Sequence, residues 1–164
     1  WDLYGTRTRV QMQKACPFEL STFEGYCLLT SSFFSAYMTN TEHRLLQAER
    51  DKAEDNTIIL HDFFYKNYDL KIKYDPSDPL KPFVEFDEQI IGSTAEAFGT
   101  IYGNGKLMCD QPVAYDSYYN VCQKFVILYT TIYVVGKGTV GTYVNILEWI
   151  SDEEAEQYKK EEGL

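Results

Sequence analysis

The sequence lacks any surplus of basic residues. Its 15 Lys and Arg stand against 25 Asp and Glu, which gives a formal net charge of −10 and a pI of about 4.6. Nucleic acids and anionic membrane surfaces attract proteins that carry a basic stripe or patch. We therefore expect neither as a partner. The acidic balance is compatible with a cationic ligand such as an amine, or with solubility alone.

Residues that bind metals or attack substrates are also scarce. His43 and His61 are the only histidines, and none of the four cysteines forms a C-x-x-C pair: Cys16, Cys27, Cys109 and Cys122. A zinc site needs closely spaced Cys or His, and a nucleophilic Cys needs a free thiol beside a base. We therefore expect no metal, no cofactor, no catalytic residue and no enzyme activity. The even number of cysteines favours two disulfides formed in an oxidising compartment.

Long hydrophobic runs are missing as well. The longest apolar run, residues 125–135, is about half of a membrane span, and threonines interrupt it. We expect no transmembrane segment. The chain starts at Trp1 rather than at Met, which is compatible with removal of a signal peptide or with an arbitrary starting point, and no N-x-[ST] sequon supports secretion. The cysteines lead us to expect a secreted, extracellular protein.

Aromatic residues, by contrast, are abundant, with 14 Tyr and 10 Phe beside 2 Trp. Tyr and Phe favour pleated, half-buried surfaces, so the composition indicates β structure. Residues 68–74 alternate cleanly, with Leu70, Ile72 and Tyr74 on one predicted face and charged residues on the other. Further strands are predicted at 57–66, 83–86, 97–102, 106–115, 121–135 and 142–150. The last two are joined by a glycine turn at residues 136–138, which lacks the spacing of a phosphate-binding loop.

The remaining segments carry weaker signals. Residues 26–38 are rich in β-formers and hydroxyls and are predicted to be extended. Residues 41–56 fit either a helix over 41–53 or the polar end of a long hairpin, and periodicity does not decide between them. Ser151 followed by three acidic residues predicts the N-terminus of a helix that runs to about Glu162.

About eight sequential strands and a C-terminal helix predict a mainly β fold. An antiparallel meander of this size must protect its edges, and we expect an eight-stranded up-and-down barrel. No change in composition marks a second domain, so residues 1–164 are expected to form one. An eight-stranded barrel can hold one small ligand.

Three segments resemble conserved stretches of the lipocalin family. Residues 113–122 (VAYDSYYNVC) are similar to its second conserved strand, and residues 143–155 resemble its last strand and the following helix. Cys16-Pro17 and residues 23–27 (FEGYC) resemble its opening. Together they cover about 50 residues, a third of a one-domain chain. The match is best with divergent secreted lipocalins of arthropod saliva, the triabin-like and tick groups.

Two positions depart from the lipocalin pattern. Cys27 stands where the family has the Trp of its G-x-W motif, and Trp149 stands where it has an Arg. In lipocalins those two residues meet and close the bottom of the barrel, and Trp149 is a candidate to close it from the other side. The resemblance implies a Cys16–Cys122 disulfide, and with it a Cys27–Cys109 disulfide.

The resemblance implies a carrier that binds a small hydrophobic or amphipathic ligand: an eicosanoid, a fatty acid, a pigment or a biogenic amine. Candidate residues on the inner face of the barrel are Phe63, Tyr65, Leu70, Ile72, Tyr74, Phe86, Tyr102, Tyr129 and Tyr133. An amine would need a buried carboxylate, for which Glu85 and Asp62 are candidates. Each of these residues fits ordinary core packing equally well.

Two other functions remain open from the sequence. The same barrel could inhibit a host or partner protein through its loops, and a filled interior would favour that interpretation. Alternatively, residues 41–66 could form long helices ahead of a curved sheet, giving a cone-shaped α+β enzyme or binder.

Overall fold

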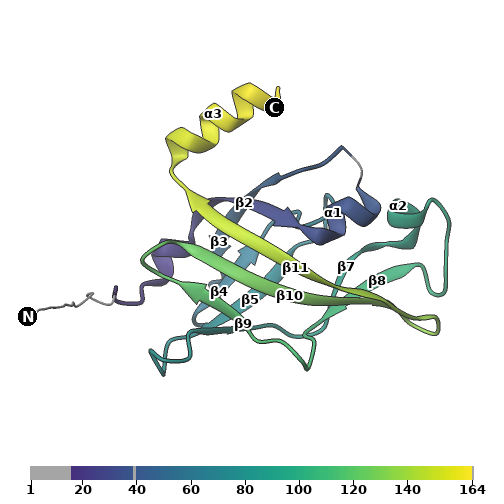
Figure 1. Ribbon diagram of the computed structural model, residues 1–164, viewed down its shortest axis with the longest axis horizontal. Coiled ribbons are helices and arrows are strands. Elements are labelled where there is room, and N and C mark those ends of the chain that lie inside the picture. The colour runs from purple at the N-terminus through teal and green to yellow at the C-terminus, as the bar shows by residue number, and fades with distance from the viewer. Residues whose placement is uncertain (1–15, 39, 164) are drawn as a thin grey trace, which may run out of the picture.

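Short strands whose residues alternate between buried and exposed form one antiparallel sheet. Eight of these strands close into a barrel (Figure 1). The computed structural model describes residues 16–38 and 40–163. Each strand of the ring pairs with the next, and β11 pairs with both β10 and β2 to close it. The ring consists of β2 (Gly25–Ser31), β3 (Arg44–Arg50), β4 (Thr57–Leu60), β5 (Leu70–Asp75), β6 (Phe83–Glu85), β9 (Ser117–Asn120), β10 (Phe125–Val134) and β11 (Gly138–Ile150).

The other two strands form a hairpin that extends the barrel at one end. β7 (Gln89–Ser93) pairs with β8 (Lys106–Asp110), and β8 pairs with the second half of β10. The first half of β10 pairs with β9 instead. At one end of the barrel β10 is therefore followed in the sheet by β9 and β6, and at the other end by β8 and β7. Buried side chains from the strands form one hydrophobic cluster in the interior.

One end of the barrel is closed by the 3-10 helix η1 (Leu20–Phe23). The Phe23 ring stacks on Tyr74 with 4.6 Å between centroids, and it meets the Trp149 indole edge-on at 5.1 Å. Both Phe23 and Trp149 are buried. Trp149 therefore lies at the end where the lipocalin resemblance places it, and it closes that end together with Phe23.

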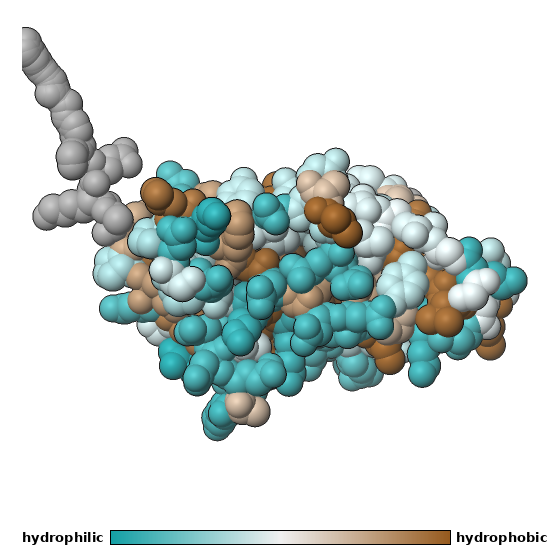
Figure 2. Space-filling model, turned by 90° about the horizontal axis from the view of Figure 1, so that it is seen from below, coloured by the Kyte–Doolittle hydropathy of each residue, from teal (hydrophilic) through white to brown (hydrophobic). Residues whose placement is uncertain are grey.

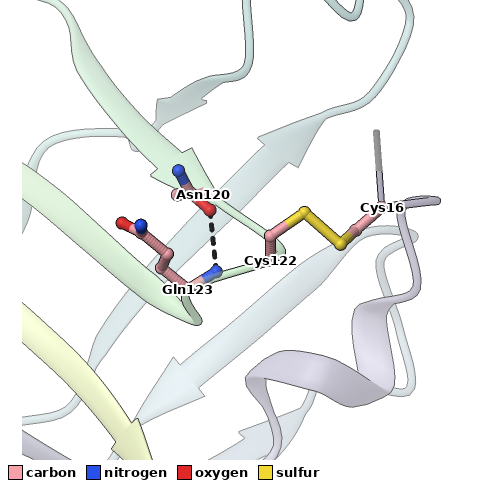
Figure 3. Close-up of a disulfide and its surroundings, with 4 residues drawn as sticks. All are labelled: Cys16, Asn120, Cys122 and Gln123. Atoms are coloured by element: carbon pink, nitrogen blue, oxygen red, sulfur yellow. Dashed lines mark hydrogen bonds between the residues drawn. A yellow bond between two sulfur atoms is a disulfide. The ribbon is translucent and has the colours of Figure 1, made fainter. Parts of the chain in front are cut away.

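The Cys16–Cys122 disulfide fastens the segment before η1 to the turn between β9 and β10, as predicted (Figure 3). The Asn120 side chain shapes that turn by accepting a hydrogen bond from the Gln123 N–H at 2.8 Å. The bridge spans 106 positions of sequence and ties the two sides of the closed end together.

The predicted Cys27–Cys109 disulfide is wrong, because both thiols are free and buried. Cys27 on β2 lies opposite Trp149, whereas Cys109 on β8 lies opposite Ile132, whose partner on β11 is Gly141. Trp149 and Gly141 are about 26 Å apart along the strand at the usual rise per residue. A disulfide needs Cα atoms within about 7 Å. Cys27, at the position of the Trp in the lipocalin G-x-W motif, therefore forms no second disulfide.

The opposite end, called the mouth from this point on, is covered by short helices and loops. These are α1 (Ser32–Tyr37) between β2 and β3, residues 61–69 between β4 and β5, and α2 (Thr94–Phe98) between β7 and β8. The turn between β10 and β11 also lies there, with Gly136 and Gly138 at positive φ as the predicted turn requires. In Figure 1 the mouth is at the right and the closed end at the left.

Two predicted elements are corrected, and one open alternative is resolved. Residues 32–37 are helical rather than extended, because the Ser31 side chain caps the first turn by accepting from the Phe33 N–H. The strand predicted at 97–102 is the end of α2 and a loop, with Gly99 in the left-handed conformation as its C-cap. The open question at 41–53 resolves into strand β3 followed by a turn, so the helices of the cone-shaped fold do not form.

The C-terminal helix α3 (Asp152–Glu162) forms as predicted, with a capping box between Ser151 and Glu154. Ala155 is its buried residue, and Lys159 lies over the ring of Tyr26 on β2 at 4.7 Å. Among the described helices, none is long and apolar enough to cross a membrane. On the face drawn in Figure 2, hydrophilic side chains form a broad band and hydrophobic ones lie in separate groups.

Candidate binding site at the mouth of the barrel

Aromatic rings from three segments meet inside the mouth. The Phe33 ring of α1 stacks on Phe64 of the 61–69 loop, with 4.4 Å between centroids and 11° between planes. Tyr143 of β11 meets Phe33 edge-on at 5.2 Å, and Tyr65 does so at 6.3 Å. Offset-stacked and edge-to-face pairs are the favourable geometries for aromatic rings. We call Phe33, Phe64, Tyr65 and Tyr143 the mouth cluster.

The local sequence explains why α1 delivers rings to this place. Ser31 ends β2 inside the barrel and caps the helix, so the chain turns across the mouth. Phe33 and Tyr37 are four positions apart and share one helix face, and their centroids are 5.0 Å apart. Tyr37 extends the contact to Phe98 of α2 at 5.3 Å. The helix therefore covers the mouth with its aromatic face directed inward.

Two wall glycines make room for the tyrosines of the mouth cluster. A Cβ atom at Gly92 of β7 would lie 2.8 Å from the Tyr65 ring, and one at Gly141 of β11 would lie 2.8 Å from the Tyr143 hydroxyl. Contacts that short do not occur for a real Cβ, so any other residue would displace the ring. The glycines thus fix the places of the two tyrosines against the wall.

The Tyr65 hydroxyl is buried without a hydrogen-bond partner among the described residues. Burial raises the pKa of Tyr65 to about 12, and the carboxylate of Glu96 adds to that rise. Tyr143 behaves alike, because burial and a hydrogen bond with Tyr37 raise its pKa to about 12. Both phenols are therefore protonated at neutral pH, and Tyr65 has an unused O–H donor. A buried donor without a partner costs about 1–3 kcal/mol.

Below the mouth cluster the interior holds a small polar network. Asn145 is fully buried, accepts from the Ser31 hydroxyl at 2.6 Å and donates to the Leu128 carbonyl at 2.9 Å and the Thr130 hydroxyl at 3.0 Å. The amide has no unused group, so the network forms a satisfied floor. This network therefore needs no ligand group to complete its hydrogen bonds.

Side chains fill the interior between this floor and the closed end. Residues such as Leu29, Ile58, Leu60 and Leu128 are fully buried there. The hollows found among the described residues lie on the outside of the barrel; one follows the seam between β5 and β7. At this seam the Gln89 side chain replaces a strand pair, since it accepts from the Lys71 N–H and donates to the Lys71 carbonyl, both at 2.9 Å.

The predicted inner-face residues divide into two groups. Those that point into the barrel are buried or nearly so: Phe63, Tyr65, Leu70, Ile72 and Tyr74. Tyr65 belongs to the mouth cluster, and Phe63 packs beside it with 4.7 Å between its centroid and that of Phe64. Tyr74 lies at the closed end against Phe23. Phe86 is also buried, beside the seam between β5 and β7.

The predicted inward orientation of Tyr129 and Tyr133 is wrong. In β10 the buried positions are Val126, Leu128, Thr130, Ile132 and Val134, so the tyrosines face outward. Tyr129 stacks on the exposed Tyr115 at 5.0 Å. Tyr102, also predicted on the inner face, is 45% exposed in the loop after α2. β10 is apolar on both faces, so alternation alone could not show which face is inward.

The two carboxylates predicted to hold an amine do not lie in a buried site. Glu85 is exposed on β6, and Asp62 is half-buried and accepts from the Asn67 N–H at 2.7 Å. The described part of the chain therefore provides no buried, unpaired carboxylate at either position.

Sequence reasoning missed most of the mouth cluster. Two features of the sequence could have revealed it. Ser31 is a good N-cap for a helix that contains Phe33, and Tyr143 lies two positions before Asn145, so the two side chains share one face of β11.

One comparison with known proteins gives a match. The model of a family described as "Domain of unknown function (DUF4984)" matches residues 3–161. No curated protein and no solved structure matches the chain.

Proposed function

The chain belongs to the DUF4984 family, and because that description carries no activity, we propose its function from the mouth of the barrel. The protein is a secreted binding protein, not an enzyme, that takes one small, flat, uncharged ligand between the rings of the mouth cluster. The buried, unpartnered hydroxyl of Tyr65 is the observation that carries this proposal.

The chemistry of the cluster defines the ligand. Phe33 and Phe64 offer flat apolar surfaces, and Tyr65 offers one O–H donor that stays protonated at neutral pH. An acceptor such as a ketone oxygen would satisfy that donor. A carboxylate would be repelled by Glu96, whose charge already acts on the Tyr65 hydroxyl. A neutral ring system with one carbonyl fits best, which favours a pigment-like molecule over a fatty acid or an amine.

The ligand must displace part of the cluster to bind. Phe33 is fully buried and stacks on Phe64 almost in parallel, so its ring occupies the position of a flat ligand. Its helix α1 has only six residues and follows directly on β2. Moving α1 outward would expose the Phe64 face while the disulfide and η1 keep the opposite end closed.

Two features support a secreted carrier. The Cys16–Cys122 disulfide suits an oxidising compartment. The closed antiparallel barrel, with a helix after its last strand and a bridge to its opening segment, is consistent with distant kinship to the lipocalins. We propose that kinship together with the carrier role.

The test uses prodan, a neutral naphthyl ketone whose fluorescence shifts to the blue in apolar surroundings. We expect a saturable shift and a one-to-one adduct in native mass spectrometry. Tyr65→Phe should weaken prodan binding by about five- to tenfold, the value of one buried hydrogen bond. Tyr74→Phe, which removes the unpartnered hydroxyl of the closed end, is the matched control and should bind like the parent protein.

A second ligand sharpens the result. Naphthalene has no acceptor, so it should bind the parent protein and Tyr65→Phe equally. Failure of prodan to bind, or an equal loss in Tyr65→Phe and Tyr74→Phe, would remove Tyr65 as the donor and the mouth as the site.

A second candidate function is protein binding through the outer face of β9, β10 and β11. Tyr118, Val144 and Ile146 are each more than a third exposed there, and Tyr115 lies beside them on Tyr129. Ile127 pairs with both Tyr118 and Ile146, so these side chains form a continuous row. Exposed apolar rows of this kind often mark interfaces. This candidate predicts a bound partner that contacts β10 and leaves α1 undisturbed.

A further inference from the structure

His61 and two carboxylates fasten the base of the loop that carries half of the mouth cluster. His61 follows β4 directly and Asp69 precedes β5 directly, so the two residues are the ends of the 61–69 loop. The His61 Nδ1 lies 3.1 Å from Asp69 Oδ2, and its Nε2 lies 2.8 Å from Glu49 Oε1 on β3. We call this arrangement the His61 clamp.

The clamp is complete only when the imidazole carries both protons. A carboxylate accepts hydrogen bonds and does not donate them, so each ring nitrogen must donate to satisfy its partner. A neutral imidazole has one N–H, which leaves its other nitrogen lone pair facing a carboxylate oxygen. Deprotonation therefore converts one of the two contacts from attraction to repulsion.

The clamp continues into the loop through its backbone. Asp69 Oδ1 accepts from the Asp62 N–H at 3.0 Å, and the Phe63 N–H donates to the Tyr68 carbonyl at 3.0 Å. Arg44 holds the same turn, since its guanidinium donates to the Asp62 and Phe63 carbonyls. Phe64 and Tyr65 lie within this tied segment. Movement of Asp69 therefore acts on the rings that fill the mouth.

We propose that the His61 clamp is a pH-sensitive latch, which holds the 61–69 loop over the mouth when His61 is protonated and loosens it when His61 is neutral. As a regulator of ligand exchange, the latch rests on the proposed function. As a control of loop opening, it does not.

The surroundings of His61 support titration in an accessible range. The side chain is 32% exposed, so it exchanges protons with solvent. Burial lowers the pKa of His61, but the hydrogen bonds to Glu49 and Asp69 outweigh it and the pKa lies above its ordinary value. The other charged groups in the adjoining groove are Glu24, Arg50 and Lys52, and Arg50 is paired with Glu24 at 2.7 Å.

The sign follows from that direction. A histidine whose pKa is higher in the folded protein than in the unfolded chain stabilises the fold below its unfolded pKa. That contribution is lost as the pH rises through the folded pKa. The loop is therefore latched in mildly acidic solution and loosens as the solution becomes neutral to alkaline.

Amide hydrogen exchange measured by NMR tests the latch. The protection factor of the Phe63 amide, corrected for intrinsic exchange, should fall by about fivefold across the titration of the His61 ring, the size expected for partly exposed ion pairs. His61→Gln should show a pH-independent protection factor, and His43→Gln, the other histidine, should behave like the parent protein. A protection factor that stays constant in the parent protein would overturn the latch.

Glu49→Gln keeps the test decisive if His61→Gln fails to fold. An amide in place of Glu49 removes one negative partner, so the His61 titration and the loss of protection should both move to lower pH. If only the titration moves, the latch is wrong. Dissociation of prodan should accelerate in the same pH window as loop opening. If the loop opens there but prodan does not bind, the latch stands and the proposed function fails. If prodan binds and its dissociation rate does not change, the latch controls the loop but its role in ligand exchange is refuted.

Discussion

At the scale of single residues, the two unpartnered tyrosine hydroxyls give the sharpest contrast. Tyr65 lies in the mouth cluster and Tyr74 at the closed end, and neither hydroxyl has a partner among the described residues. Removing a buried, unsatisfied hydroxyl should raise the free energy of unfolding by about 1–2 kcal/mol at either position. Urea denaturation of Tyr65→Phe and Tyr74→Phe measures this directly.

Only one of the two substitutions should affect ligand binding. A Tyr65→Phe protein that is more stable and binds prodan less tightly would show that the hydroxyl is retained for binding. If Tyr65→Phe is destabilised, the hydroxyl makes a stabilising hydrogen bond in the unliganded protein, and its role as a free donor is refuted.

Residue orientation was predictable where one face of a strand is charged. In β5, Lys71 and Lys73 alternate with Leu70, Ile72 and Tyr74, and the predicted inward residues are indeed buried. In β10 both faces are apolar, and the predicted orientation of Tyr129 and Tyr133 failed. Alternation specifies orientation only when the two faces differ in polarity.

At the scale of elements, the seam between β5 and β7 is a place where the described sheet has no strand pairing. The Gln89 side chain alone bridges Lys71 to β7 by two hydrogen bonds. Gln89→Leu should remove both and expose the Lys71 amide, so its hydrogen exchange should accelerate by at least about tenfold. Amide exchange measured by NMR tests this.

Gln111→Leu is the matched control, because Gln111 lines the same groove without bonding to Lys71. It should leave the Lys71 amide protected. Equal protection of that amide in both variants would show that β5 and β7 hold together without the Gln89 amide.

Elements with clear end signals were predictable, and those set by tertiary context were not. The Ser151 cap and the Gly136 and Gly138 turn were correct. Helix α1 was missed because its residues are good β-formers, and the Ser31 cap acts only where β2 ends at the mouth. The strand β9 was indicated only by the lipocalin resemblance of residues 113–122, because four residues between loops give too short a pattern of alternation.

At the scale of the whole molecule, one disulfide holds the closed end. It links positions that are 106 residues apart, and closing so long a loop should stabilise the fold by about 5 kcal/mol in the chain-entropy description. The double variant Cys16→Ser with Cys122→Ser should lose about that much in urea denaturation. Cys27→Ala and Cys109→Ala, each without a bridge to break, should not respond to reducing agent differently from the parent protein.

The barrel itself was predictable from the number and spacing of strands, because a meander of that size must close. The position of the site was not. The lipocalin resemblance indicated a ligand in the interior, but packing of Leu29, Ile58 and Leu128 fills that space. Among the described residues, unpartnered buried donors lie at both ends, and only that of Tyr65 lies among the aromatic rings of the mouth cluster.

The most direct test of ligand binding at the mouth is an NMR titration of isotope-labelled protein with prodan. We predict that the largest chemical-shift changes fall on the mouth: Phe33, Phe64, Tyr65, Gly92 and Tyr143. Residues of the closed end, such as Phe23 and Trp149, should stay unchanged. Changes confined to the outer face of β10 and β11, or none at saturating prodan, would contradict binding at the mouth.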